Sequence, residues 1–274
     1  MIDKCVFPVA GLGTRFLPVT KSVPKEMLPI LSTPLIEFAV KEAYGCGISE
    51  MVMVTNPSKE SIFNYFQENE ELNEMIKDTN KSNSLSVLKK LTREAKFSYL
   101  YQKEALGLGH AIHQAKDYID GPFAVILSDD LCFSPNNSVL EQLINVYKKN
   151  PDKCIVALEE VPDEHIHKYG IVDGTVVKDN ILKINSMIEK PTIEEAPSNL
   201  AIIGRYILLP EVFKILDTTM ADRNGEIQIT TALIELAKKG KVLGCKYSGK
   251  RFDCGSVDGY IDANIYFRDK KLII

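Results

Sequence analysis

The sequence of 274 residues contains no tryptophan and no long hydrophobic run. A membrane-spanning helix needs about 20 consecutive apolar residues, and nowhere do even about 18 follow one another, which excludes a membrane span. The first apolar run, CVFPVA, follows the charged pair Asp3 and Lys4 and is too short for the core of a signal peptide. We therefore expect a cytoplasmic protein with no membrane partner.

An excess of positive charge is also absent. The chain has 33 Lys and Arg against 37 Asp and Glu, a net charge of −4 at pH 7. A polynucleotide is held by a basic surface, so we expect no nucleic-acid partner, and any phosphate ligand needs a local site. A composition that is 45% hydrophobic and 26% charged is that of a globular chain and excludes disorder and collagen.

Cysteine is present, but not in a metal-binding pattern. The six cysteines form no Cys-x-x-Cys pair and have no histidine at zinc-finger spacing, which argues against thiolate metal sites. Most of them, such as Cys5 and Cys154, stand in apolar stretches. We predict small buried hydrophobic residues in a reducing compartment.

The first 160 residues alternate between strand-like and helix-like patterns. β-rich runs occupy residues 5–9, 51–55, 97–101, 123–127 and 154–159, and segments with apolar residues at intervals of three and four occupy 35–44, 58–66, 109–118 and 138–149. Strands that are apolar nearly throughout are typical of sheets covered on both faces. The pattern predicts an α/β fold, Rossmann-like, with a mostly parallel or mixed sheet and helices on both faces.

The alternation weakens beyond residue 160. A short antiparallel hairpin with its turn at Asp173-Gly174 is expected within residues 170–177, followed by strands at 201–209 and 242–247 and helices at 211–216, 228–239 and 257–267. Residues 67–96 predict an exposed helical excursion. No repeat and no linker rich in Pro, Gly or Ser divides the chain, so we expect one domain over residues 1–274.

The densest chemical signal is the segment PVAGLGTRFLPVTKSVPKEMLP, residues 8–29, directly after the first strand. Its four prolines exclude a regular helix over most of its length, and Gly11 and Gly13 permit unusual backbone angles. A Gly-x-Gly loop at the carboxyl end of a strand lets backbone N–H groups approach a phosphate, and Arg15 and Lys25 add cations. The P-loop pattern is absent, and Phe16 breaks the dinucleotide pattern.

Paired acids are expected to close the buried strand FAVILSDD. Asp129 and Asp130 are expected at the carboxyl end of that strand, where α/β sheets bind ligands. Mg²⁺ prefers one or two carboxylates together with phosphate oxygens and is the expected partner. A helix cap or a solvated strand end is the alternative interpretation of the pair.

The remaining candidates have ordinary alternatives. Gln102 carries a donor and an acceptor that suit the edge of uracil, and Gly107 lets a base lie close to the backbone. His110 and His113 are expected on one helix in capping or packing roles rather than as zinc ligands. Glu226 and Gln228 are expected to open a helix, where they hydrogen-bond a sugar or simply favour the helix dipole. Arg205 is interpreted as a binding candidate or an ordinary surface residue.

These motifs resemble those of the sugar-nucleotide pyrophosphorylases, and within them the bacterial UTP–glucose-1-phosphate uridylyltransferases. The resemblance spans nearly the whole chain, and GLGTRFLPVTKSVPKEMLP is its most specific segment. Relatives that use dTTP typically carry Lys-Gln-Leu-Leu-Pro where this chain has KEMLP, which favours uridylyl transfer. Further matches are GLGHA at 107–111, SDD at 128–130, YGIV at 169–172, EKP at 189–191, GRY at 204–206, GEIQ at 225–228 and DCGS at 253–256.

The resemblance implies a role for each site residue. Arg15, Lys25 and Lys190 are the expected catalytic cations, with Lys190 on the sugar phosphate. Nucleotide binding is assigned to Ala10, Gly11, Leu12, Gly13, Thr14, Glu26, Gln102, Gly107 and Asp130, and sugar binding to Gly170, Glu189, Gly204 and Glu226. Asp129 is favoured as the first metal ligand, with Asp130 left open, and Asp253 resembles the second. The family also implies a homodimer or homotetramer.

The implied reaction joins UTP and glucose 1-phosphate to give UDP-glucose and pyrophosphate. A sugar phosphate has a second pKa of about 6, so the attacking oxygen is largely ionised at neutral pH and needs no general base. Positioning and charge neutralisation with Mg²⁺ then supply the rate of an in-line attack. The alternatives are a thymidylyltransferase, another sugar-1-phosphate nucleotidylyltransferase, or a catalytically idle nucleotide-binding regulatory subunit.

Overall fold

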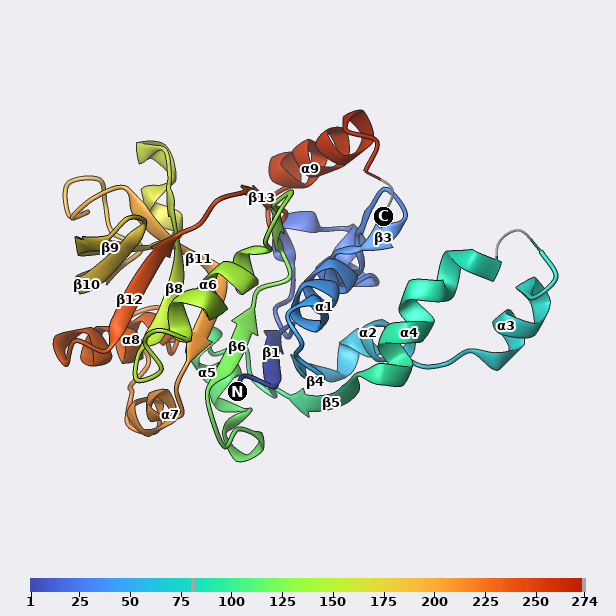
Figure 1. Cartoon of the computed structure of the whole chain (residues 1–274), viewed down its shortest axis with the longest axis horizontal. Coiled ribbons are helices and arrows are strands. Elements are labelled where there is room, and N and C mark those ends of the chain that lie inside the picture. The colour runs from blue at the N-terminus through green and yellow to red at the C-terminus, as the bar shows by residue number, and fades with distance from the viewer. Residues whose placement is uncertain (80–81, 273–274) are drawn as a thin grey trace.

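A nine-stranded mixed sheet runs through the computed structural model, which describes residues 1–79 and 82–272 (Figure 1). Four parallel strands form one half, in the order β5 (Lys96–Tyr101), β4 (Glu50–Thr55), β1 (Lys4–Pro8) and β6 (Phe123–Ile126). The other half continues with β11 (Leu200–Leu208), β8 (Cys154–Glu160), β12 (Val242–Lys246), β10 (Ile181–Glu189) and β9 (Gly170–Lys178). Here only β8 and β12 pair in parallel. The α/β class predicted from the alternating pattern is confirmed.

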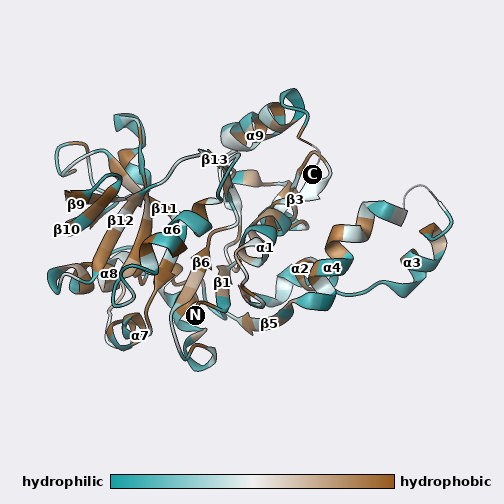
Figure 2. Cartoon of the chain, viewed as in Figure 1, coloured by the Kyte–Doolittle hydropathy of each residue, from teal (hydrophilic) through white to brown (hydrophobic). Residues whose placement is uncertain are grey.

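Helices cover both faces of the sheet because successive strand residues point to opposite sides. Cys5 and Phe7 of β1 pack on one face, and Val6 between them packs on the other. The first face is covered by α1 (Leu35–Gly45), α2 (Glu60–Tyr65), α4 (Ser86–Glu94) and α6 (Val139–Tyr147). The second is covered by α5 (Leu108–His113), α7 (Glu211–Leu216) and α8 (Ile229–Lys238). Figure 2 shows the resulting apolar strands between more polar outer helices.

The expected hairpin with a turn at Asp173-Gly174 is wrong. These two residues lie inside β9, a single strand that ends at Lys178 and pairs with β10. The chain turns instead at Asp179 and Asn180, where Asp179 adopts a positive φ of 48°. Asp and Asn tolerate this conformation better than most residues. The Asp-Gly pair is a local turn signal, but the longer pairing of β9 with β10 places it inside a strand.

The exposed helical excursion is confirmed over the described residues. It contains α3 (Glu70–Ile76) and α4, and Figure 1 shows this arm extending away from the sheet. Asn69 caps α3 by accepting a hydrogen bond from the N–H of Leu72. No residue of α3 is buried.

A small second sheet lies beside the main one and was not predicted. It pairs β7 (Asp130–Phe133) with β13 (Lys250–Asp253), and α9 (Val257–Asp269) packs against it through a separate apolar cluster. A further ribbon pairs β2 (Pro29–Ile30) with β3 (Thr33–Pro34). Strands of this length carry too few residues to show a period, but β7 and β13 place two acidic residues side by side.

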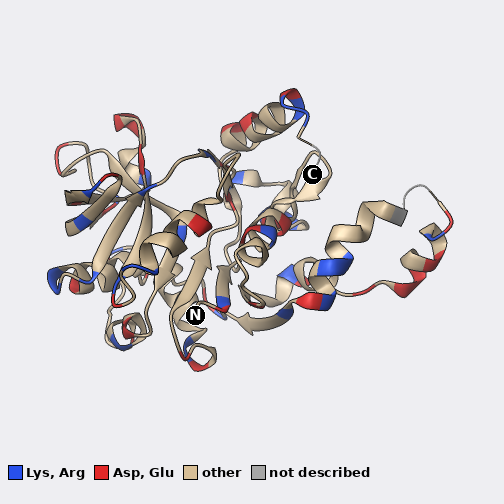
Figure 3. Ribbon diagram, in the orientation of Figure 1, with Lys and Arg blue, Asp and Glu red and all other residues tan. Residues whose placement is uncertain are grey.

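The surface agrees with the composition. Figure 3 shows acidic and basic residues interspersed along the ribbon of the outer elements. Within the described ranges, no helix has the length and apolarity needed to cross a membrane. All six cysteines are free, and Cys5, Cys154, Cys245 and Cys254 are buried, as predicted for most of them, whereas Cys46 and Cys132 are partly exposed.

Candidate active site

The loop after β1 is shaped by three single turns of 3-10 helix: η1 (Thr14–Phe16), η2 (Val19–Lys21) and η3 (Lys25–Met27). Gly13 has a φ of 65°, which favours glycine, and its carbonyl accepts a hydrogen bond of 2.8 Å from the Thr20 hydroxyl. A side chain at Gly13 would come within 3.2 Å of the Lys25 Cβ atom. The prediction of a shaped loop in place of a regular helix is confirmed.

The loop leaves its backbone donors available. The N–H group of Val9 still bonds to Val54, but those of residues 10–14 donate no hydrogen bond to any part of the chain that the structure describes. The Asn56 side chain holds the loop from the other side by donating to the Ala10 carbonyl at 2.6 Å. Consecutive free N–H groups beside cationic side chains form a site suited to an anion.

Lys25 lies against Asp129 at the end of this loop. Its Nζ atom is 2.5 Å from the Asp129 Oδ2 atom. Burial raises the pKa of Asp129, but the Lys25 ammonium and then Arg15 outweigh it, so this pKa lies below its usual value. Burial lowers the pKa of Lys25, but Asp129 and Glu26 raise it above its usual value. Both side chains are therefore charged at neutral pH.

Asp129 and Asp253 face each other across Gly255. The Asp129 Oδ2 and Asp253 Oδ1 atoms each lie 3.0 Å from the point where a Cβ atom at Gly255 would stand. A side chain there would fill the space between the two carboxylates. Arg15 borders the same space and donates to the Gly255 carbonyl at 3.3 Å. Burial, followed by Asp130 and Asp129, raises the pKa of Asp253 above its usual value, against Arg251 and Arg15.

The two carboxylates fit a hard cation that takes its other ligands from a phosphate. No group of three or more His, Cys, Asp or Glu side chains in the described ranges is arranged to hold a metal ion by itself. Mg²⁺ does not need such a group, because it keeps several waters and binds one or two carboxylates plus substrate phosphates.

Asp130 differs from its neighbour. The two acids do not close the buried strand, because β6 ends at Ile126 and Asp130 already begins β7. Its Oδ1 atom accepts from Arg251 at 2.6 Å, and its Oδ2 atom accepts from the N–H of Gly204 at 2.7 Å. Both oxygens of Asp130 thus have protein donors, whereas Asp129 faces Lys25 and the space beside Gly255.

Arg251 connects the strands around the site, and sequence reasoning missed it. Besides Asp130, its guanidinium donates to Glu159 at 2.6 Å and to the Tyr169 hydroxyl at 3.0 Å. Tyr169 in turn donates to Asp253 at 3.4 Å. Arg251 follows Lys250 in a short strand that carries no distinctive motif. Its role is visible only from its partners on β7 and β8.

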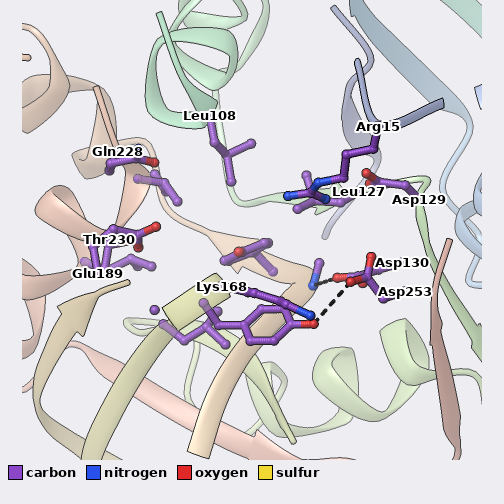
Figure 4. Close-up of a pocket in the computed structure, with 17 residues that line it drawn as sticks. Arg15, Leu108, Leu127, Asp129, Asp130, Lys168, Glu189, Gln228, Thr230 and Asp253 are labelled. Carbon is purple, nitrogen blue, oxygen red and sulfur yellow. Dashed lines mark hydrogen bonds between the residues drawn. The ribbon is translucent and has the colours of Figure 1, made fainter. Parts of the chain in front are cut away.

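A cavity of about 190 Å³ opens between these acids and the second half of the sheet. Figure 4 shows Arg15, Asp129 and Asp253 at one end and Gln228, Thr230 and Glu189 at the other. Gly170 and Gly204 line the cavity, as does Asp130. Glu189 accepts a hydrogen bond from the Thr230 hydroxyl. Lys168 and Thr230 are lining residues that the sequence did not point to, and Tyr169 was noted only as part of the YGIV match.

Lys190 and Glu226 lie beyond the Glu189 end. Lys190 follows β10 with a φ of 47°, and its Nζ atom lies 3.6 Å from the Glu226 carboxylate. Glu226 accepts from the Gln228 amide at 2.5 Å. The expectation that Glu226 and Gln228 open a helix is wrong in detail, because α8 begins at Ile229 with Gln228 as its N-cap residue.

Gln102 follows β5 and is 6% exposed. Its backbone N–H bonds to Thr55, so the ends of β5, β4 and β1 and the opening loop form one connected edge. The Gln102 amide nitrogen lies 3.2 Å from the Gly107 carbonyl and 2.9 Å from His110 Nδ1. His113 packs edge-on against Phe213, as expected for a packing role, and its Nε2 atom lies 2.8 Å from the Asp217 carboxylate.

Two charged residues are more deeply buried than expected. Glu26 is 1% exposed, and its carboxylate is paired with Lys59 at 2.7 Å. Arg205 is 2% exposed, so the interpretation of an ordinary surface residue is wrong. Its guanidinium donates to Glu42 on α1 at 2.8 Å and to the carbonyl groups of Leu127 and Gly204, which are buried acceptors that only a cation with several donors satisfies together.

The family model described as nucleotidyl transferase matches residues 6–270. This match covers the opening loop, both faces of the sheet and the acids on β7 and β13. The chain belongs to the nucleotidyl transferase family.

Relatives narrow the assignment within that family. The chain is 50% identical over 266 residues to a UTP–glucose-1-phosphate uridylyltransferase of Pseudomonas aeruginosa, covering 96% of this chain and 95% of that one. It is 39% identical over 274 residues to the enzyme of that name from Bacillus subtilis, covering 99% and 93%. These matches place it among the UTP–glucose-1-phosphate uridylyltransferases.

Solved structures agree. A UDP-glucose pyrophosphorylase without ligand matches with a TM-score of 0.95 and 48% identity, covering 99% of this chain and 100% of that one. A UDP-glucose pyrophosphorylase in complex with UDP-glucose matches with a TM-score of 0.92 and 47% identity, covering 98% and 100%.

Proposed function

We propose that this protein transfers the uridylyl group of UTP to glucose 1-phosphate, giving UDP-glucose and pyrophosphate. One observation carries the proposal. Arg15 of the opening loop, Asp129 with its partner Lys25, and Asp253 meet at one end of a cavity whose other end holds Glu189 and Thr230. Relatives similar over nearly the whole chain bear the name of this activity.

The chemical difficulty of the reaction is repulsion between two anions. The sugar phosphate is largely a dianion at neutral pH because its second pKa is about 6, so its oxygen attacks the α-phosphorus without a general base. Arg15, Lys25 and the loop N–H groups hold the triphosphate and the departing pyrophosphate. Lys190 holds the attacking phosphate. Fixed cations of this kind supply the rate through positioning and charge neutralisation.

Asp129 and Asp253 are the proposed ligands of Mg²⁺, and Asp130 is not required for that role because both of its oxygens are occupied. When bound, the ion neutralises charge that develops on the phosphate oxygens. Lys25 pairs with Asp129 in the structure, so Lys25 has to share or exchange this partner when a phosphate arrives.

The two ends of the site are assigned to different parts of the substrates, the nucleotide and the sugar. Ala10, Gly11, Leu12, Gly13 and Thr14 present backbone to the nucleotide, and Gln102 with Gly107 faces the base. Gly170, Glu189, Gly204 and Glu226 are assigned to the sugar. For Glu26 the buried pair with Lys59 favours a supporting role under the loop over a direct contact through its carboxylate.

A substrate panel tests the function. Pyrophosphate release is measured with UTP or dTTP against glucose 1-phosphate, galactose 1-phosphate and N-acetylglucosamine 1-phosphate. We expect the highest kcat/KM for UTP with glucose 1-phosphate. A preference for dTTP or another sugar would replace the proposed substrates, and UTP binding without turnover on any sugar would indicate the idle regulatory subunit.

The family resemblance also supports a homodimer or homotetramer. Light scattering coupled to gel filtration measures the mass directly. A mass of one chain at micromolar concentration would contradict this proposal without affecting the catalytic one.

A further inference from the structure

The side-chain amide of Gln102 is held by two neighbours. The Gly107 carbonyl lies 3.2 Å from its Nε2 atom, and the Nδ1 atom of His110 lies 2.9 Å from the same nitrogen. A carbonyl oxygen can only accept, so the Gly107 contact fixes which side of the amide is the nitrogen. The Oε1 atom of Gln102 has no hydrogen-bond partner in the described part of the chain.

This orientation determines the proton position on His110. Because the Gln102 Nε2 atom donates, the Nδ1 atom must accept, and the ring proton therefore sits on Nε2. The Gln114 amide nitrogen lies 3.2 Å from that ring nitrogen and donates to the His110 carbonyl at 3.3 Å, which fixes its orientation. A neutral ring accepts at one nitrogen only, and the closer contact, at 2.9 Å, is that of Gln102 with Nδ1, so the ring N–H group makes no hydrogen bond with Gln114. Burial, with His113, lowers the pKa of His110 against the opposing effect of Glu104, so the ring is neutral at pH 7.

The segment around His110 is held rigidly. Gly109 donates to the Ile227 carbonyl at 2.8 Å, and Ile227 donates back to Leu106 at 2.7 Å. Gly107 has a φ of 92°, and a side chain there would stand 2.9 Å from the Glu226 Cβ atom. Backbone contacts on both sides of the histidine thus fix the position of its ring relative to Gln102.

The orientation of the Gln102 amide determines which pyrimidine base the site accepts. Both hydrogens of the Gln102 amide are used inside the protein, so the side chain offers an acceptor outward. The N3 position of uracil or thymine carries an N–H group, whereas N3 of cytosine is itself an acceptor. Two acceptors facing each other leave a desolvated polar group unpaired, which costs about tenfold or more in affinity.

We propose that His110 is a positioning residue that makes the site selective for pyrimidine bases with an N3–H donor, by holding the Gln102 amide with its oxygen toward the base. This inference rests on the proposed function, because it requires a nucleotide base beside Gln102.

The test compares two replacements that differ in one atom type. His110→Phe keeps a ring but has no acceptor, whereas His110→Asn keeps an amide oxygen that can stand near the Nδ1 position. We expect His110→Phe to raise KM for UTP about tenfold with little change in kcat and to reduce the UTP/CTP ratio of kcat/KM by a similar factor. His110→Asn should retain most of that ratio.

His113→Phe is the matched control. It lies on the same helix and contacts Asp217 rather than Gln102, so its UTP/CTP ratio should equal that of the unmodified protein. Calorimetric binding of UDP and CDP gives the same comparison without turnover. Should His110→Phe unfold, Gln102→Met removes both the donor and the acceptor and should lose the same discrimination.

The outcomes separate this inference from the proposed function. A protein that turns over neither UTP nor dTTP with any sugar phosphate defeats the proposed function itself. If the unmodified protein prefers UTP to CTP and His110→Phe preserves that preference, only the positioning role of His110 is overturned. An unchanged preference in Gln102→Met overturns it in the same way.

Discussion

Three neighbouring aspartates acquire different properties from their partners. Asp129 has a cation at 2.5 Å and a pKa below its usual value, and Asp130 has Arg251 at 2.6 Å. Asp253 is the third, with weaker hydrogen bonds from Tyr169 and Gly255 and a raised pKa. Asp253 is therefore the carboxylate with the most to gain from a divalent cation.

Replacement of this carboxylate should separate activity from stability. Asp253→Asn removes a proposed metal ligand, and we expect kcat/KM to fall at least about 100-fold. The same change removes a partly buried charge that Asp130 and Asp129 repel, so the ligand-free variant should melt at or above the temperature of the unmodified protein. Turnover at limiting Mg²⁺ and a thermal melt measure the two effects.

Asp262→Asn is the control, because this acid is exposed on α9 and should change neither quantity. Near-normal turnover of Asp253→Asn at limiting Mg²⁺ would refute its role as a ligand.

Lys190 provides a second test at this scale. Among the residues that the structure describes, its Nζ atom has only a loose contact with Glu226, at 3.6 Å, so it is available to a sugar phosphate. Lys190→Ala should raise KM for glucose 1-phosphate about tenfold and KM for UTP much less. Initial rates with each substrate varied in turn measure the ratio, and Lys178→Ala, an exposed lysine on β9, is the matched control. An equal rise in both KM values would contradict the assignment.

At the scale of elements, a buried ion pair connects α1 to the strand ends beneath the site. Arg205 on β11 donates to Glu42 on α1 and to the carbonyl of Leu127, two residues before Asp129. Glu42 also accepts from the N–H of Leu140 at the start of α6. The pair thus holds two helices and the turn that carries the acids.

Removal of the cation alone should leave Glu42 uncompensated. Arg205→Met should lower the free energy of unfolding by about 3–5 kcal/mol. Arg205→Met with Glu42→Gln removes the buried charge but keeps an acceptor for Leu140, so it should recover part of the loss. Urea denaturation measures both, and Arg268→Met, in an exposed pair with Asp269, should stay within about 0.5 kcal/mol. A double variant no more stable than the single one would contradict the explanation.

At the scale of the whole molecule, the cavity spans the two halves of the sheet. Arg15 and Asp129 come from the parallel half and its loops, and Glu189 and Thr230 come from the region of β10 and α8. A ligand that contacts both ends stabilises the folded state by binding it alone.

UDP-glucose should therefore raise the melting temperature. At a concentration of 100 times Kd, binding to the folded state adds about 2.7 kcal/mol, which corresponds to several degrees for a domain of this size. Thermal melts with UDP-glucose, UDP and glucose 1-phosphate compare the whole ligand with its parts. A shift with UDP-glucose no larger than with UDP would contradict a sugar contact at the Glu189 end.

Much of the fold was predictable because its signals are local. The strand around Val6 and the helices flanking it show their periods within ten residues, and the loop between Pro8 and Pro29 shows its shape in its prolines and glycines. The short strands β7 and β13 were not predictable, because their pairing joins residues more than 100 positions apart. The turn at Asp179 was missed because the Asp-Gly turn signal at 173–174 lies inside the longer pairing of β9 with β10.

Some features of the site likewise follow from the sequence, and others depend on the fold. Residue types and spacing in the chain are sufficient for an α/β sheet, an anion-binding loop after its first strand and acids suited to a metal, since backbone geometry and charge act over a few residues. Whether Asp129 or Asp130 is free, why Arg205 is buried and which way Gln102 points depend on the fold. For the acids and Arg205 the answer lies in hydrogen-bond partners far away in the chain, which only packing brings close. The partners of Gln102 are close in sequence, but the contact of Gly109 with Ile227 holds their segment in place.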